Sequence, residues 1–181
     1  EVKRNVPQNA IYKAWHICER MHPDYYAFDL LSDVLSRGNS SRLYQDLVKE
    51  KGLFTEISAY QMGSMEPGLF MISGKVKEGI EVSEADRAIT DSLQKIKNKL
   101  VTSEELTKVK NKVESTDSFG HMSGLNIAMR LGYWELLGDA NLCNHEMEEY
   151  AKVTSQDLQR VATESLTETN CSTLYYLSEK N

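Results

Sequence analysis

Residues 27–60 read AFDLLSDVLSRGNSSRLYQDLVKEKGLFTEISAY, and this stretch decides the fold. Its first part has the 3.6-residue hydrophobic period of an amphipathic helix, which Gly38 is placed to stop. A second, short helix is predicted to follow, capped by Ser40 or Ser41 and ended by Gly52. The last residues of the stretch then have the composition of a strand.

The sequence on either side predicts an α+β fold. Strands are expected at residues 10–18, 54–62, 68–76 and 171–177. Turn residues between the second and third of these favour an antiparallel hairpin. Between the third and the fourth the hydrophobic period is helical, and capping boxes at residues 102–105 and 154–157 mark two helix starts. Such segregation is typical of a mostly antiparallel sheet with helices packed on one face.

The chain is expected to form a single domain over residues 1–181, because no linker-like, repetitive or low-complexity segment interrupts it. A chain of this length buries roughly 70% of its unfolded surface, which is enough for a hydrophobic core without disulfides or metals. It begins at Glu1 with neither a methionine nor an apolar signal region. We therefore expect it to be a piece excised from a longer protein.

Composition argues against several functional classes. With 27 acidic against 21 basic residues the formal net charge is −6, which argues against a nucleic-acid partner. No stretch approaches the apolar length of a membrane span. Cys18, Cys143 and Cys171 are three in number and widely spaced, so no disulfide framework and no C-x-x-C pair is expected.

The four histidines offer few metal sites. His16, Cys18 and His22 are close in sequence, but a strand ending in a loop does not converge three or four ligands at about 2.0–2.3 Å. His145 and Glu149 could share a helix face, yet zinc-peptidase signatures need a second histidine where Glu149 stands. We expect neither cluster to bind a metal, and the domain to hold no cofactor.

Motifs for other chemistry are also missing. The sequence has neither a G-x-S-x-G nucleophile elbow nor a phosphate-binding G-x-x-x-x-G-K-[ST] loop. The turn at residues 38–42 could bind an anion at a helix start, but a capping turn explains every residue in it except Arg42. The sequence alone thus predicts a non-catalytic domain.

The stretch at residues 27–60 resembles the pitrilysin/insulinase superfamily of zinc peptidases, which includes the mitochondrial processing peptidase. In that superfamily a helix leads to a glycine-rich turn, then S-S-R-L-Y or a variant, then L-x-x-x-x-G-L and a strand. The matching positions are Gly38, Ser40, Ser41, Arg42, Leu43, Tyr44, Leu47, Gly52 and Leu53. Weaker similarities at residues 66–70, 102–110 and 153–162 keep the superfamily's order and spacing.

The resemblance implies a particular half of a two-domain enzyme. Superfamily members pair two domains of similar fold that close like a clamshell around a peptide. One of the two carries H-x-x-E-H and a downstream glutamate, which bind zinc and activate water. This chain lacks that motif. It therefore resembles the non-catalytic half, whose partners would be a homologous zinc-bearing domain, in the same chain or another subunit, and an extended peptide substrate.

One departure from the superfamily pattern concerns substrate binding. Non-catalytic halves often hold the substrate with an arginine and a tyrosine from an L-R-x-x-x-G-L-x-Y segment. Alignment on that segment places Val48 and Thr55 at these two positions, and neither side chain can take the role. Arg42, Lys49 and Tyr60 are nearby alternatives.

Two competing hypotheses stay open at this stage. The same fold serves in respiratory-complex core proteins, so the chain could be a structural or assembly subunit without a role in proteolysis. A stand-alone enzyme would need a metal at His16 and His22 or at His145. The sequence favours a soluble protein of the bacterial cytoplasm or periplasm, and it names neither the compartment nor the substrate peptides.

Overall fold

The computed structural model of the protein describes residues 1–179, which are built on one five-stranded sheet. The strands are β1 (Val2–Arg4), β2 (Ala10–Ile17), β3 (Phe54–Met62), β4 (Gly68–Val76) and β5 (Cys171–Ser178). Their order across the sheet is β1-β5-β2-β4-β3. Neighbouring strands are antiparallel except β1 and β5, which are parallel. The mostly antiparallel sheet predicted from the sequence is confirmed.

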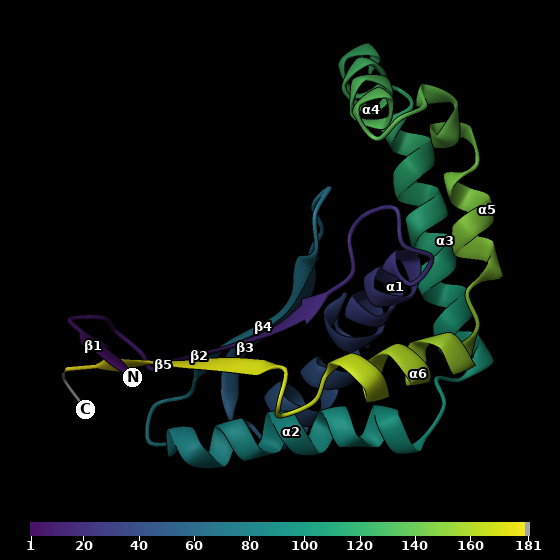
Figure 1. The fold of residues 1–181 in the computed structure, drawn as a ribbon. Helices are drawn as coiled ribbons and strands as arrows, with labels where there is room; N and C mark the ends of the chain where they lie inside the picture. The colour runs from purple at the N-terminus through teal and green to yellow at the C-terminus, as the bar shows by residue number, and fades with distance from the viewer. Residues whose placement is uncertain (180–181) are drawn as a thin grey trace.

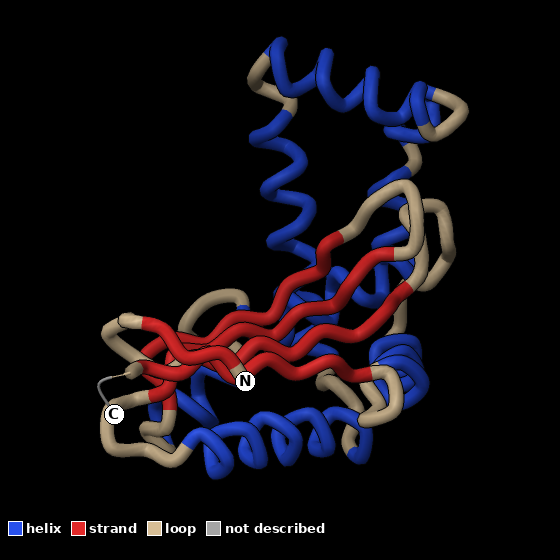
Figure 2. The backbone as a smooth tube through the Cα atoms, turned by 60° about the vertical axis from the view of Figure 1, so that its left-hand side comes forward, coloured by secondary structure: helices blue, strands red, loops and turns tan. Residues whose placement is uncertain are grey.

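Helices cover one face of this sheet. In chain order they are α1 (Tyr25–Ser36), η1 (Tyr44–Glu50), α2 (Val82–Asn98), α3 (Ser103–Gly120), α4 (Gly124–Leu136), η2 (Ala140–Asn144), α5 (Glu146–Lys152) and α6 (Ser155–Ser165). α2 and α6 run along one side of the sheet, and α3 and α5 rise past its end to carry α4 (Figure 1). Figure 2 shows the strands from their uncovered side. Within residues 1–179, no helix is long and apolar enough to cross a membrane.

Alternation along the strands explains this one-sided arrangement. On β2, Ile11 and Trp15 are buried in the core, whereas Tyr12 and His16 are exposed on the opposite face. Helix α1 is buried almost all round because it lies between β3 on one side and α3, α5 and α6 on the other. The hydrophobic core is therefore a single layer between the sheet and its helices.

A partly buried ion pair fixes α2 against the sheet. Lys13 lies on the core side of β2, where its ammonium donates to a carboxylate oxygen of Asp86 in α2 at 2.6 Å. The Tyr175 hydroxyl of β5 donates to the other oxygen of Asp86 at 3.0 Å. A buried charge is tolerated when it is paired in this way. The contact ties two neighbouring strands to one helix.

Most of the locally encoded features form where the sequence predicts them. The hairpin of β3 and β4 and the capping boxes at Thr102 and Thr154 are confirmed. The predicted short helix exists, but its bonds are of the π type, as in the Lys51 amide bonding the Asp46 carbonyl five residues back. The predicted cap by Ser40 or Ser41 is wrong, because the Ser41 hydroxyl donates to the Gly38 carbonyl and the Ser40 hydroxyl accepts from Lys108 instead of from a helix amide.

Two matched glycine substitutions test the packing of the core. An added Cβ at Gly74 in β4 would lie 2.7 Å from the ring of buried Phe54, so we expect Gly74→Ala to lower the free energy of unfolding. Overpacking of this kind costs about 1–3 kcal/mol. Gly132 in the middle of α4 has nothing within 4 Å of that position, so Gly132→Ala should raise the free energy by about 0.5–1 kcal/mol. Urea unfolding measures both, and equal effects of the two variants would contradict the packing described.

Candidate functional site

Several large apolar side chains are exposed on the face of the sheet that the helices do not cover. We call it the open face, and its larger side chains are Tyr12 and His16 of β2, Tyr60 and Met62 of β3, Leu69 and Met71 of β4, and Leu174 and Tyr176 of β5. Tyr12, Tyr60 and Leu174 are 37–40% exposed, and Met62 is 52% exposed. Contiguous apolar surface of this kind marks a binding surface more often than a solvent-facing one.

The strand register makes this surface continuous. Tyr12 stands opposite Leu174 on one side, and Tyr60 stands opposite Met71. Directly opposed side chains in an antiparallel pair lie close enough to touch. Toward the start of β3 the face turns polar, with the hydroxyls of Ser58 and Ser73 2.9 Å apart. The open face therefore has an apolar centre and a polar end.

Strand β3 is also an edge of the sheet. It pairs with β4 on one side, and no other strand within residues 1–179 pairs with it on the other. The edge is interrupted near its start, where the register shifts between Phe54 and Glu56 and leaves Thr55 in a bulge. Beyond this bulge the edge runs along the side of the open face that carries Tyr60. An unpaired edge offers backbone groups to an extended chain.

The five residues weighed from the sequence lie in different surroundings. Tyr60 lies on the open face, and Thr55 lies in the bulge at the start of the same strand. Val48 and Lys49 belong to η1, where Val48 packs against the core and Lys49 is exposed. The structure thus places Tyr60 alone among them on the open face, and which residue touches a substrate stays a prediction.

Arg42 has a structural partner. Its Nε and one terminal nitrogen each donate to a carboxylate oxygen of Glu105 at 2.8 Å, a bidentate ion pair between the turn before η1 and the start of α3. Glu105 is also the acidic residue of the capping box with Thr102. The Arg42 guanidinium, helped by the Thr102 amide, lowers the pKa of Glu105 to about 2. The charge of Arg42 is therefore engaged in holding two helices together.

The histidines are dispersed. His16 is exposed on the open face, and Nδ1 of His22 accepts from the Asp24 amide at 3.1 Å. His145 occupies the N-cap position at the start of α5, and its Nδ1 lies 3.3 Å from a carboxylate oxygen of Glu148. Burial raises the pKa of the nearby Cys18 thiol to about 11, which disfavours the thiolate that metal binding needs. In the part of the chain that is described, no group of three or more His, Cys, Asp or Glu side chains could hold a metal ion.

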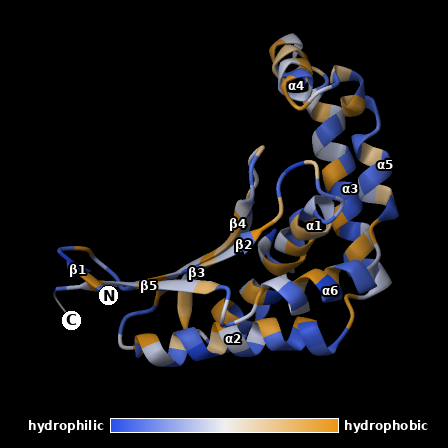
Figure 3. Ribbon diagram, viewed as in Figure 1, coloured by the Kyte–Doolittle hydropathy of each residue, from blue (hydrophilic) through white to orange (hydrophobic). Residues whose placement is uncertain are grey.

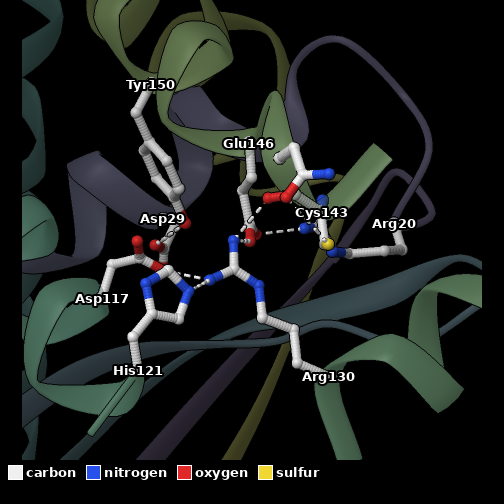
Figure 4. A network of polar contacts seen from close by, with 9 residues as sticks. Arg20, Asp29, Asp117, His121, Arg130, Cys143, Glu146 and Tyr150 are labelled. Carbon is white, nitrogen blue, oxygen red and sulfur yellow. Dashed lines mark hydrogen bonds and ion pairs between the residues drawn. The ribbon is translucent and has the colours of Figure 1, made fainter. Parts of the chain in front are cut away.

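A largely buried charge network lies near the α4 end of the molecule, between residues too far apart in the sequence to form a local motif (Figure 4). Arg20, which follows β2, donates to Glu146 of α5 at 2.5 Å. Arg130 of α4 donates to the other oxygen of Glu146 at 3.0 Å and to the Cys143 carbonyl at 2.6 Å, and it forms an ion pair with Asp117. Burial raises the pKa of Glu146, against the opposing effect of the two arginines. This network joins α4 to the rest of the domain.

Comparison with known proteins gives a consistent result. The family model described as "Peptidase M16 inactive domain" matches residues 1–113. A Helicobacter pylori protein named Zinc protease PqqE is 24% identical over 154 residues, 85% of this chain and 35% of that protein. The crystal structure of a protease from H. pylori has a TM-score of 0.90 at 22% identity and covers 97% of this chain and 43% of that chain. That of the inactive peptidase domain of a Bordetella parapertussis protein has a TM-score of 0.86 at 22% identity, covering 97% and 96%.

The lengths of these relatives differ from the length of this chain. The chain spans about a third of the curated relatives that it matches, between 30% and 35% of each. The Bordetella domain, by contrast, is covered almost completely. The match over residues 1–113 contains the stretch at residues 27–60 that carries the resemblance found in the sequence.

The ion pair of Arg42 and Glu105 predicts a pH dependence. Because the pKa of Glu105 is lowered on folding, its contribution to stability is complete above its ordinary pKa of 4.5 and is lost as the pH falls toward about 2. Glu105 is about one-third exposed, so solvent screening reduces this contribution to about 1 kcal/mol. We expect Glu105→Gln to remove that part of the acid sensitivity in urea unfolding between pH 5 and about pH 2. Glu104→Gln, at an exposed neighbour, is the control and should leave it unchanged.

Proposed function

The chain belongs to the peptidase M16 inactive domain family, and we propose that its open face forms one wall of a peptide-binding chamber opposite a homologous zinc-bearing domain. Family membership, which residues 27–60 predict, supports this proposal, as does the similarity to relatives that are named zinc proteases. The activity, substrate and partner of the whole protein are inferred, because this chain spans about a third of the relatives' length.

The open face is the observation that carries the proposal. Its apolar part around Tyr60 and Met71 can receive the side chains of an extended peptide, whose other side would face the catalytic domain. The edge of β3, which no other strand within residues 1–179 pairs with, can pair with the peptide backbone, a mode in which main-chain hydrogen bonds give affinity and side-chain contacts give specificity. Both features belong to the same strand.

The residues present indicate which role each of the two domains would have. Zinc on the partner domain would supply an activated water and polarise the scissile carbonyl. The described residues of this chain include no group suited to hold that metal. Their part is to bind the peptide, to fix its direction through the β3 edge, and to exclude water from the chamber. Binding of this kind speeds the reaction by positioning the substrate.

Removal of this domain is the direct test. We expect the zinc-bearing domain encoded in the same or a neighbouring gene, recognised by H-x-x-E-H, to keep its zinc when expressed alone but to lose at least about tenfold in kcat/KM, because its substrate is no longer positioned. Elemental analysis gives the zinc content, and cleavage of a fluorogenic peptide library gives the rate. If the isolated zinc domain cleaves as fast as the complete protein, this domain is a structural or assembly subunit instead.

A substitution on the open face tests the surface itself. Tyr60→Ser removes an exposed ring from the β3 side of the face, so the KM of the complete protein for peptides should rise by roughly threefold to tenfold, as expected for the loss of a moderate apolar contact. Leu100→Ser is the matched control, because Leu100 is equally exposed, at 39% against 40%, but lies between α2 and α3. Both variants should unfold at the wild-type temperature. Equal KM values for the two variants would exclude the open face as the substrate wall.

A further inference from the structure

Helix α4 stands apart from the rest of the domain and is apolar on its exposed sides. It lies at one end of the molecule, beyond the sheet and above α3 (Figures 1 and 2). Leu125, Met129 and Leu136 are 65–73% exposed, and Met122 in the turn before the helix is 81% exposed. Figure 3 shows hydrophobic colour along α4, which lies apart from the sheet. Of the whole helix, Trp134 is the one buried residue.

Such a helix is costly to leave in water. Isolated helices of this length are marginally stable even in favourable sequences, and most helices in proteins depend on a buried apolar face. Here the face that would normally be buried is the one exposed. Exposed apolar surface that is contiguous over several helical turns is typical of a surface that another protein covers.

Charged and aromatic contacts hold α4 in a fixed direction in place of apolar packing. The indole of Trp134 stacks on the guanidinium of Arg20, 4.6 Å from ring centre to carbon, and Arg20 is 4% exposed. Arg130, one turn earlier on α4, bonds Glu146 on the same side (Figure 4). Both anchors lie on one side of the helix, so Leu125, Met129 and Leu136 are presented outward in a defined orientation.

The charges on α4 decide what kind of partner fits it. The helix carries two charged residues, Arg130 and Glu135. Arg130 is engaged in the buried network, and the Glu135 carboxylate accepts from the Ala140 amide at 3.2 Å. With no free basic side chain on the helix and a net charge of −6, the surface suits neither an anionic lipid bilayer nor nucleic acid. It suits an apolar groove on a protein.

The relatives indicate which protein supplies the groove. Their chains extend well beyond the part that aligns with this domain, which is 35% of the H. pylori zinc protease and 43% of the solved H. pylori chain. We propose that α4 docks into an apolar groove of the homologous zinc-bearing domain and sets the position of the two halves. This inference rests on the proposed function, because it takes the same domain as the partner.

Two glutamates on α4 test the docking surface. Leu125→Glu with Met129→Glu places two charges one turn apart on the outer side of α4, where neither side chain belongs to the core. The probe is the H-x-x-E-H domain from the same or the neighbouring gene, expressed as a separate polypeptide. Titration calorimetry should show binding to the wild-type chain and to the control Leu100→Glu. The double variant should bind at least about tenfold more weakly, with an unchanged circular dichroism spectrum and melting temperature.

The other outcomes separate this inference from the proposed function. Equal binding of the double variant and the wild type would overturn the docking surface, as would no binding by the wild type or the absence of an H-x-x-E-H domain from both genes. Self-association of the wild-type chain that the double variant abolishes, with partner binding unchanged, would assign α4 to a second copy and overturn it too. Binding that depends on α4 but does not raise peptidase activity would leave the docking surface in place and contradict the chamber wall.

Discussion

Coverage of one face of the sheet by helices is the constraint on which the rest of this structure depends. Because Ile11 and Trp15 of β2 lie in the core, Tyr12 and His16 must lie on the other face of the sheet. The neighbouring strands follow the same alternation. The helices then have to cross on one side only, which places α1 at the centre of the core. The position of the apolar residues on the open face is thus a direct consequence of the register. They give the domain a preformed surface.

A second constraint acts at the other end of the molecule, where buried charges and not apolar contacts define the position of α4. Arg20 lies 126 residues from Glu146 in sequence, yet the two groups meet at 2.5 Å with little solvent around them. Breaking one partner of such a pair is costly because it leaves an uncompensated charge, so the geometry is specific even where its net contribution to stability is small. The orientation of α4, which carries Arg130, is therefore fixed relative to the rest of the domain, although little of the helix surface is buried.

These two regions differ in how well the sequence predicts them. Strands 10–18, 54–62 and 68–76 follow from local composition, and the capping box of Thr102 follows from its spacing, because the interactions responsible lie within a few residues of one another. Strand β1 was not predicted, since three residues carry no period and their parallel pairing with β5 joins the two ends of the described chain. The Arg20 network has no local signal either, because Arg20 and Glu146 lie 126 residues apart in the sequence. Helical periodicity after residue 120 predicts a helix, but it does not say that the helix projects from the domain.

The residues that carry the family resemblance can now be interpreted physically. Gly38 and Gly52 have positive φ angles of 81° and 63°, which other residues rarely adopt, and Leu43 is fully buried. Arg42, in the turn between these two glycines, is bound by Glu105. These side chains maintain the connection from α1 through η1 to β3, so their match identifies the fold and the family without marking a binding residue. Substrate and partner contacts must then come from surfaces with no role in holding the domain together, and the open face and α4 are two surfaces that meet this requirement.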